Sequence, residues 1–330
     1  MTPKPIIHVF GEVLFDCFPD GKRVLGGAPF NVAWNLQGFG LKPQFMSRIG
    51  DDLEGKEVLN LMTNWGMNCD ALQTDVTYPT GLVQVKISDR EPHYDIVTNS
   101  AYDFIDEHLL PTIKAKIKTD GILYHGSLGI RNPISLQALQ AFKANHQGKI
   151  FVDVNLRDPW WQRETLFPLL NDANWVKVNE HELAILLQHL ADAFRTGSFP
   201  TSGGETPFLS STVMKSFVYP ETLDLESDIK KFCQQFDLDI VIVTLGEQGA
   251  IVWDKQQFTR VKPTANIQVV DTVGAGDAFV SVFLLGLSKQ WTIGNILEKA
   301  QAFAGEIVMR RGATTTDRDF YQSFSFPMED

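Results

Sequence analysis

Short apolar segments and amphipathic helical segments alternate along most of this chain, and that alternation limits its fold more than any other feature. Apolar runs of strand length, bounded by turn residues, occur at residues 6–10, 45–49, 121–125, 149–154, 175–178 and 240–245. Helical periodicity occupies residues 31–39, 53–65, 135–145 and 180–190. Strands that alternate with helices in this way predict an α/β fold, a doubly wound and mainly parallel sheet with helices on both faces.

Two parts of the N-terminal half break the alternation. Residues 12–25 and 80–100 contain short β patterns, and Asp89-Arg90-Glu91-Pro92 separates 81–88 from 93–99 as a turn. We expect antiparallel strands in both parts. The sequence leaves open whether these strands form a small lid of their own or a hairpin at the edge of the main sheet.

The charge balance narrows the choice of partners. The chain of 330 residues has 29 Lys and Arg against 40 Asp and Glu, a formal net charge of −11. This balance does not suit the phosphates of nucleic acid or anionic lipid. We therefore expect a small-molecule substrate, no nucleic acid and no membrane partner.

Cysteine usage and hydropathy indicate the compartment. Cys17, Cys69 and Cys233 are far apart and form no paired framework, which suits a reducing environment. No apolar run reaches eighteen residues, and residues 1–5 lead into the first strand without a secretory pattern. We expect a cytoplasmic protein with a single domain over residues 1–330.

One segment combines glycines, carboxylates and the start of a small-residue-rich helix at 275–287. It reads Asp271-Thr272-Val273-Gly274-Ala275-Gly276-Asp277-Ala278-Phe279. Free N–H groups at a helix start bind anions, and Gly274 and Gly276 let main chain approach a phosphate. Asp277 can take a proton from a hydroxyl that attacks this phosphate. The alternative is a glycine turn that caps a helix, with acidic residues at the positive end of its dipole.

Three segments near the ends of predicted strands carry polar groups that suit a sugar. Asp16 follows the first strand, where ligands of open α/β sheets bind, and its carboxylate can accept two hydroxyl hydrogen bonds. In Gly26-Gly27-Ala28-Pro29-Phe30-Asn31, the glycines permit close approach to a polyol, and Asn31 offers a donor and an acceptor. Asp153-Val154-Asn155-Leu156-Arg157 follows another strand, and its polar residues suit a wet cleft. A turn role for Asp16, a solvated Asn31 and a structural pair of Asp153 with Arg157 are the alternatives.

Further segments admit both a structural and a ligand-binding interpretation. Asn179 and Glu182 have the spacing of a capping box. Thr244-Leu245-Gly246-Glu247-Gln248-Gly249 lies between apolar strands and has the composition of a hairpin turn. On the helix predicted at 293–310, Ala302, Phe303 and Gly305 suit either a wall for a base or internal packing.

These segments resemble, in order, the motifs of the ribokinase-like (PfkB) family of sugar and nucleoside kinases, and the resemblance covers about residues 5–314. The nine residues at 271–279 match the family signature. The resemblance implies a ribokinase-like fold in which residues 12–25 and 80–100 form a small β lid over the sugar, and a homodimer through these lids. Residues 194–223 exceed what the family places at this point, so we expect an insertion there.

The resemblance also implies roles for individual residues. Asp277 would be the catalytic base, and the amides of Gly274, Ala275 and Gly276 would hold the transferred phosphate. Sugar contacts would come from Asp16, Gly26, Gly27, Asn31, Asn155 and Arg157, and ATP contacts from Asn179, Glu182, Thr244, Gly246, Gly249 and Thr272. Asn179 and Glu182 would orient water around Mg²⁺, while the Asp271 carboxylate and the Val273 carbonyl would reach a monovalent cation such as K⁺.

The implied activity is transfer of the γ-phosphate of ATP to a primary hydroxyl of a small sugar. Fructose is the first choice, because of the Gly-Glu-x-Leu-x-Asp start, the Gly-Gly-Ala-Pro-x-Asn form and the Asn-x-Arg segment. A 2-keto-3-deoxygluconate kinase and a nucleoside or other sugar kinase of the same family remain alternatives. A catalytically silent sensor of sugar or nucleotide is the non-enzyme alternative.

Overall fold

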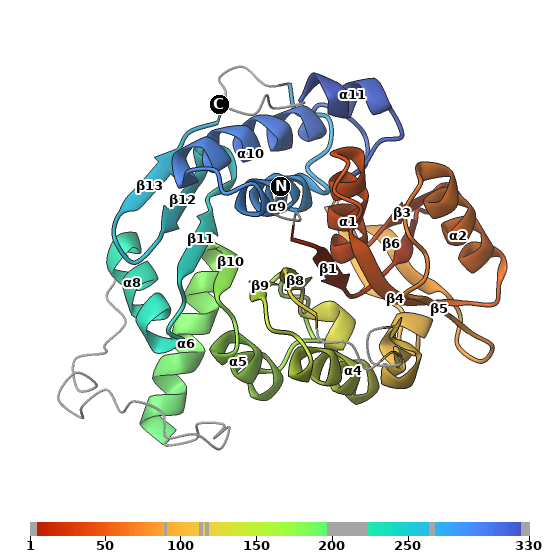
Figure 1. Cartoon of the computed structure of the whole chain (residues 1–330), viewed down its shortest axis with the longest axis horizontal. Helices are drawn as coiled ribbons and strands as arrows, with labels where there is room; N and C mark the ends of the chain where they lie inside the picture. The colour runs from red at the N-terminus through yellow and green to blue at the C-terminus, as the bar shows by residue number, and fades with distance from the viewer. Residues whose placement is uncertain are drawn as a thin grey trace.

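The computed structural model describes residues 5–88, 91–111, 115, 119–196, 224–263 and 268–324. These residues form a large nine-stranded sheet with helices on both faces and a small four-stranded sheet beside it (Figure 1). The strands of the large sheet are, in spatial order, β13 (Phe258–Val261), β12 (Ala250–Trp253), β11 (Ile240–Thr244), β10 (Trp175–Asn179), β9 (Lys149–Asp153), β8 (Ile122–His125), β1 (Ile7–Phe10), β4 (Gln44–Gly50) and β5 (Leu72–Asp75). Neighbours from β11 to β5 pair in parallel, whereas β12 and β13 are antiparallel. The predicted doubly wound, mainly parallel sheet is confirmed.

Helices cover both faces of this sheet, because buried apolar side chains lie on both faces. One face carries α1 (Ala28–Gly38), α2 (Leu53–Trp65), α9 (Ala275–Ser288), α10 (Ile293–Val308) and α11 (Arg318–Ser323). The other face carries α4 (Pro133–Ala144), α5 (Arg163–Asn171), α6 (Glu180–Thr196) and α8 (Leu225–Gln235). Short 3₁₀ helices are η1 (Ala101–Phe104), η2 (Glu107–Leu109), η3 (Leu128–Ile130) and η4 (Gly246–Gln248). Among the described residues, no helix is both long enough and apolar enough to cross a membrane.

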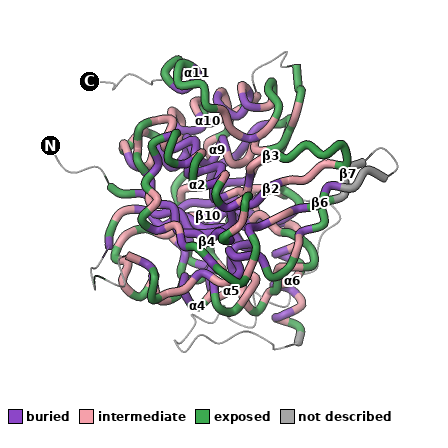
Figure 2. Tube along the Cα trace, turned by 90° about the vertical axis from the view of Figure 1, so that its right-hand side faces the viewer, coloured by how far each residue is buried: buried purple, intermediate pink, exposed green. Residues whose placement is uncertain are grey.

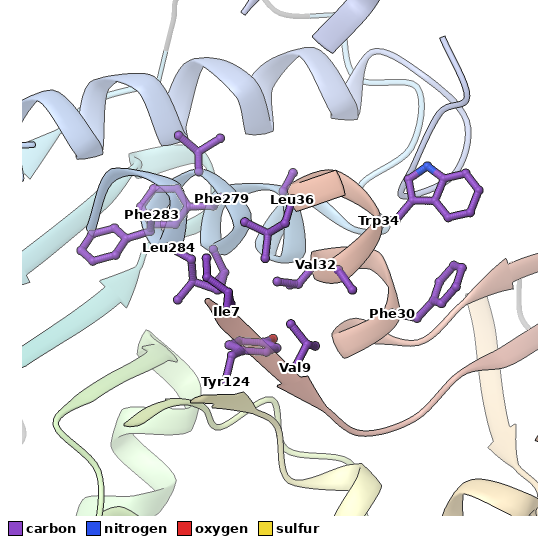
Figure 3. Close-up of a cluster of buried hydrophobic side chains, with 14 of the residues drawn as sticks. Ile7, Val9, Phe30, Val32, Trp34, Leu36, Tyr124, Phe279, Phe283 and Leu284 are labelled. Carbon is purple, nitrogen blue, oxygen red and sulfur yellow. The ribbon is translucent and has the colours of Figure 1, made fainter. Parts of the chain in front are cut away.

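Successive side chains of a strand pack against the helices on opposite faces of the sheet. Ile7 and Val9 of β1 pack under α1 and α9, and Figure 3 shows them with Phe279 and Phe283. Phe10 of the same strand joins the core on the opposite face, because successive side chains of a strand point to opposite sides. Buried residues are therefore concentrated along the sheet (Figure 2). A strand covered on both sides reads as a continuous apolar run, which is why the sequence revealed it.

The small sheet has the order β3 (Arg23–Gly26), β2 (Leu14–Cys17), β6 (Gly81–Ser88) and β7 (Glu91–Ile96). The pairs β2–β3 and β6–β7 are antiparallel, as expected, and β2 pairs with β6 in parallel. The alternative of a hairpin at the edge of the main sheet is wrong. Glu91 and Pro92, expected in a turn, begin strand β7, and Pro92 is tolerated because β7 is an edge strand.

The predicted insertion at 194–223 lies mostly outside the described residues. Its first three positions belong to α6, which continues to Thr196. Residues 197–223 are not described, and of the expected turn Asp89-Arg90-Glu91-Pro92 the first two residues are also outside the described chain.

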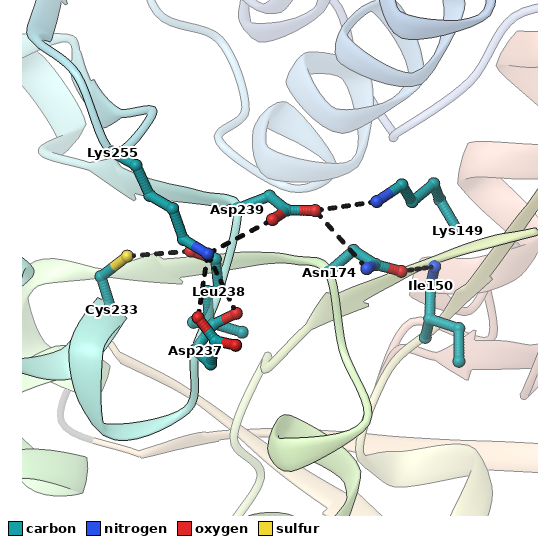
Figure 4. Close-up of polar contacts among 8 residues, drawn as sticks. All are labelled: Lys149, Ile150, Asn174, Cys233, Asp237, Leu238, Asp239 and Lys255. Atoms are coloured by element: carbon teal, nitrogen blue, oxygen red, sulfur yellow. Dashed lines mark hydrogen bonds and ion pairs between the residues drawn. The ribbon is translucent and has the colours of Figure 1, made fainter.

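A polar network joins the amino ends of the central strands (Figure 4). Lys149 Nζ lies 2.9 Å from Oδ2 of Asp239, and Lys255 Nζ lies 2.9 Å from Oδ1 of Asp237. Asn174 Oδ1 accepts a hydrogen bond of 2.9 Å from the backbone N–H of Ile150. These contacts fix the loops at one end of the sheet and leave the carboxyl ends of the strands as the other, ligand-binding end.

Candidate active site

A cavity of about 450 Å³ lies where the carboxyl ends of the strands meet the start of α9. The predicted site residues that line it are Asp16, Gly27, Asn31, Asn155, Arg157, Thr272, Val273, Gly274, Gly276 and Asp277. Lining residues that we had not predicted as site residues are Glu12, Leu14, Ala28, Val83, Tyr94, Ile96, Leu128 and Lys177. Residues from the first, second and last thirds of the chain thus share one cavity.

Asp277 lies in the first turn of α9 and is held by a side chain from the far end of the sequence. Its Oδ2 accepts a hydrogen bond of 2.8 Å from Nδ2 of Asn31, 246 positions away. Helix α1 begins at Ala28, so Asn31 belongs to its first turn, and Asn31 is 4% exposed. The alternative of a solvated Asn31 is therefore wrong.

The carboxyl of Asp277 is hard to ionise at this place. Burial raises its pKa to about 6, and the negative charge of Asp153 adds to the rise. The hydrogen bond from Asn31 and the positive charges of Lys177 and Arg157 oppose it. A pKa just below neutrality suits a group that takes up a proton and releases it again.

The helix start beside Asp277 is built on a left-handed glycine. Gly274 is the N-cap of α9 at φ 80°, and a Cβ at this position would collide with Ala313. The N–H of Ala275 donates to the carbonyl of Thr272 at 3.3 Å, a long bond within the turn. The first N–H groups of a helix have no partner within the helix, so this end presents donors to an anion.

Lys177 is a residue that sequence reasoning missed. Its Nζ lies 3.0 Å from Oδ1 of Asp153, and both side chains are buried. Burial alone would lower the pKa of Lys177, but the carboxylates of Asp153 and Glu182 hold it above its ordinary value. A Cβ on Gly276 would lie 3.5 Å from this Nζ, so the amine reaches the start of α9. The signal in the sequence was a lysine inside the apolar strand Trp175–Asn179.

The alternative of a structural pair between Asp153 and Arg157 is wrong, because Asp153 pairs with Lys177 instead. Arg157 is exposed, and its Nη1 donates to the carbonyl of Leu156 at 3.0 Å. Its positive charge lies close enough to Asp16, in the cavity, to lower the pKa of that carboxyl. Burial nevertheless raises the pKa of Asp16 to about 6.

Asn179 and Glu182 form the capping box that the sequence offered as an alternative. Asn179 Oδ1 accepts from the N–H of Glu182, and Glu182 Oε2 accepts from the N–H of Asn179, each at 2.8 Å. Glu182 Oε1 accepts a further bond of 2.9 Å from the N–H of Leu156. Glu182 thereby holds the segment that carries Asn155 and Arg157 against the start of α6.

The segment from Thr244 to Gly249 connects β11 and β12 as a hairpin, and a second pocket of about 570 Å³ lies beside it. This pocket is lined by Leu245, Glu247, Gln248, Ala250, Arg260, Val261, Lys262 and Pro263. The predicted residues Thr244, Gly246 and Gly249 flank it without lining it. Phe303, considered for a base-binding wall, is fully buried against the rings of Phe39 and Tyr321 and is a packing residue.

Gly26 and Asp271 support the cavity from outside it. A Cβ on Gly26 would lie 3.3 Å from Oδ2 of Asp16, so the glycine leaves room for that carboxylate. Asp271 Oδ1 accepts from the N–H of Val273, and its Oδ2 accepts from the N–H of Gly312, each at 3.0 Å. Asp271 thereby fixes the turn that leads into α9.

An acidic residue beside a helix start, opposite polar side chains that suit a polyol, is an arrangement for moving a phosphoryl group to an alcohol. Residues 17–319 match the family model described as pfkB family carbohydrate kinase, and the chain belongs to this family. It is a phosphotransferase of the carbohydrate kinase class.

Relatives and solved structures agree with this family. A probable fructokinase-5 from Arabidopsis thaliana is 28% identical over 327 residues, which cover 92% of this chain and 90% of the relative. A fructokinase double mutant from Vibrio cholerae O395, solved with fructose, ADP and potassium ion, has a TM-score of 0.74 at 24% identity, with 98% and 99% of the two chains covered. An ATP-bound fructokinase from Xylella fastidiosa has a TM-score of 0.77 at 21% identity, with 98% of each chain covered. These two structures share the fold.

Proposed function

We propose that this protein is an ATP-dependent fructokinase that transfers the γ-phosphate to a primary hydroxyl of fructose. The observation that carries the proposal is the Asp277 carboxyl, held by Asn31 in a cavity at the start of α9. Fructose is favoured because the Arabidopsis relative is named a probable fructokinase and the Vibrio structure contains fructose. The polar groups of the cavity suit a small polyol.

Asp277 is the proposed base. Asn31 occupies Oδ2 of the carboxylate, so Oδ1 is the oxygen that we expect to take the proton from the attacking hydroxyl. With a pKa of about 6, most Asp277 side chains are ionised at neutral pH. Proton removal raises the nucleophilicity of the sugar oxygen as its bond to phosphorus forms and the bond to the ADP oxygen breaks.

The start of α9 and Lys177 are the proposed anion-binding groups. The amides of Gly274, Ala275 and Gly276 lie at a helix start whose dipole favours negative charge, and the bond from Ala275 to Thr272 is long enough to give way to an anion. The amine of Lys177 adds a full positive charge close to Gly276. Such preorganised groups stabilise the charge of the phosphoryl oxygens during transfer.

For the sugar, we propose contacts from Asp16, Gly27, Asn31, Asn155 and Arg157, which line the cavity. Gly26 would act indirectly, by leaving space for Asp16. For ATP, we propose the neighbourhood of Thr244, Gly246 and Gly249, beside the second pocket, together with Thr272.

Asn179 and Glu182 fit a role in orienting water around a phosphate-bound Mg²⁺ rather than direct coordination. Their oxygens already accept backbone hydrogen bonds and retain further lone pairs. Among the described residues, no group of three or more His, Cys, Asp or Glu side chains could hold a metal. Mg²⁺ would neutralise charge on the ATP phosphates, and it keeps several waters when phosphates bind it.

A monovalent cation such as K⁺ is proposed beside Asp271 and the carbonyl of Val273. The two Asp271 oxygens each accept one backbone N–H bond, so this carboxylate is fixed in place for a further contact. A cation there would strengthen the positive field at the start of α9. Turnover measured in potassium and in sodium chloride of equal strength tests this, and equal rates would contradict it.

The small sheet is proposed as a lid over the sugar and as the surface of a homodimer. Val83, Tyr94 and Ile96 from its strands line the cavity, and Tyr94 is 50% exposed. Within the described part of the chain, β3 and β7 are the edge strands of this sheet, and an edge strand can pair with a second chain. Light scattering during gel filtration tests the dimer, and a monomeric mass at working concentration would contradict it.

A cytoplasmic location is also proposed. Cys17, Cys69 and Cys233 are all free thiols, which suits a reducing compartment. Fractionation of cells that produce the protein tests this location, and recovery outside the cytoplasmic fraction would contradict it.

A coupled assay of ADP release tests the activity directly. We expect turnover with fructose to exceed turnover with ribose, 2-keto-3-deoxygluconate and nucleosides, and NMR of the product identifies the phosphorylated hydroxyl. Preference for another of these substrates would replace fructose as the proposed substrate and leave the proposed kinase activity in place. Absence of turnover with all of them would favour a silent sensor.

A further inference from the structure

Glu12 is a buried carboxyl in the cavity whose role the sequence did not indicate. It follows strand β1, is 2% exposed and lines the same cavity as Asp277. Gly129 of η3 packs against it so closely that a Cβ there would lie 3.0 Å from Oε2. The backbone amides of Glu12 itself and of Ala28 favour the charged form of the carboxyl.

Two of the residues that line this cavity each carry a buried acceptor atom without a donor. Oε2 of Glu12 and Oδ1 of Asn31 are both buried, and neither has a hydrogen-bond partner among the described residues. Asn31 already uses its Nδ2 to donate to Asp277. Buried polar atoms are nearly always paired, and an unpaired one costs free energy. Unpaired acceptors on two residues that line one cavity favour a ligand that brings at least two donors, as a polyol does.

We infer that Glu12 is a further sugar-binding residue whose Oε2 accepts a hydrogen bond from a hydroxyl of the bound sugar, while Asn31 Oδ1 accepts from a second. This inference rests on the proposed function, that the cavity binds a sugar. Glu12 discriminates between sugars because a substrate that lacks the hydroxyl leaves a buried acceptor unpaired, which sites of this kind reject strongly.

The charge state of Glu12 gives the inference a second observable. Burial raises the pKa of Glu12 to about 7, Asp277 raises it further, and Arg157 lowers it. The charge of Glu12 also raises the pKa values of Tyr102, Tyr124 and Arg131. A hydroxyl that donates to Oε2 favours the ionised carboxyl, so sugar binding releases a proton from the protonated fraction. With a pKa of about 7, Glu12 is partly protonated at neutral pH.

Calorimetric titration with fructose tests the inference on the whole chain without relying on turnover. Glu12→Gln keeps the shape of the side chain and removes its charge, and we expect fructose to bind about tenfold or more weakly. Proton release, obtained from titrations in buffers of different ionisation enthalpy, should disappear in this variant. The matched control Glu164→Gln changes an exposed glutamate of α5 and should bind like the wild type.

Deoxy analogues separate a sugar contact from a structural role. The analogues are the monodeoxy fructoses and 2,5-anhydromannitol. The one that lacks the hydroxyl bound by Glu12 should bind the wild type with about the affinity that fructose has for Glu12→Gln. For that analogue, Glu12→Gln should bind only slightly more weakly than the wild type, because the side chain and the hydroxyl contribute one shared interaction. Losses of equal size for every analogue in the variant would overturn the inference.

Unchanged fructose affinity in a folded Glu12→Gln protein would also overturn it. If this variant does not fold, as judged by circular dichroism, Glu12→Asp serves instead, since it withdraws the carboxylate by one methylene and should weaken fructose binding selectively. If the wild type binds no sugar, the proposed function itself is wrong. If the wild type binds fructose and the Glu12 variant binds it equally well, only the role of Glu12 is wrong.

Discussion

Replacing Asp277 by Asn should make the protein more stable and, at the same time, nearly inactive. The folded state holds the Asp277 carboxyl at a pKa of about 6 instead of the ordinary 3.8. Between these values the folded state binds the proton more tightly than the unfolded state does. The stability contributed by the protonated carboxyl is therefore present below pH 3.8 and is lost as the pH rises through 6.

The size of the effect follows from this difference in pKa. A shift from 3.8 to about 6 corresponds to roughly 3 kcal/mol of lost stability above pH 7. Because Asp277 is only partly buried and faces an open cavity, we expect about half of this, ~1.5 kcal/mol. For 330 residues, with an unfolding entropy of about 2.1 cal/mol/K per residue, the Asn variant should gain about 2 °C in Tm. Loss of the base should lower kcat by roughly 10² to 10⁴.

Thermal unfolding at several pH values, paired with the ADP-release assay, measures both effects. The gain in Tm should be present at pH 7.5 and shrink toward zero near pH 4. The control Asp51→Asn, which alters an exposed pair with Lys56, should change Tm and rate little. A destabilised Asp277→Asn protein, or one that keeps near-normal turnover, would refute the reasoning.

Three further outcomes are expected. The kcat/KM for fructose should fall as the pH drops through 7 and 6, where Glu12 and Asp277 take up protons, and a pH–rate profile that stays flat from 8 to 5 would contradict this. Lys177→Met should cost about 3–5 kcal/mol in urea unfolding, because it leaves Asp153 buried without its partner, and adding Asp153→Asn should recover much of the loss. Asp239→Asn, in the exposed network at the amino ends of the strands, should cost less than about 1 kcal/mol, and a larger shift in the urea midpoint would show that this network is stronger than surface pairs usually are.

The main sheet could be predicted because its strands are covered on both faces and therefore read as apolar runs. Strand β1 begins one residue later than expected, and β10 ends one residue later. Elements with weaker patterns escaped prediction. Strand β5 has the sequence Leu-Gln-Thr-Asp, and α5 contains Pro168, which normally argues against a helix interior.

The site was only partly predictable, for a different reason. Residue types and local spacing pointed to Asp16, Asn31 and Asp277, and all three line the cavity. The partner of a buried charge depends on the register between strands, which no local pattern records. Asp153 meets Lys177 because β9 and β10 pair in parallel with these two residues opposite each other. A pairing with Arg157, four positions away in sequence, was the alternative that local spacing offered, and it is wrong.

The same physical terms that make this cavity reactive also make it costly to fold. Burial raises the pKa values of Glu12, Asp16 and Asp277 to between about 6 and 7, so three carboxyls that face one cavity resist ionisation. Lys177 and Arg157 offset part of this cost, but one cation is committed to Asp153 and the other is exposed. A sugar whose hydroxyls donate to these oxygens provides hydrogen bonds that offset the cost of ionising the carboxyls. Binding should therefore stabilise the ionised carboxyls and bring Asp277 into its proton-accepting form when the hydroxyl to be phosphorylated arrives.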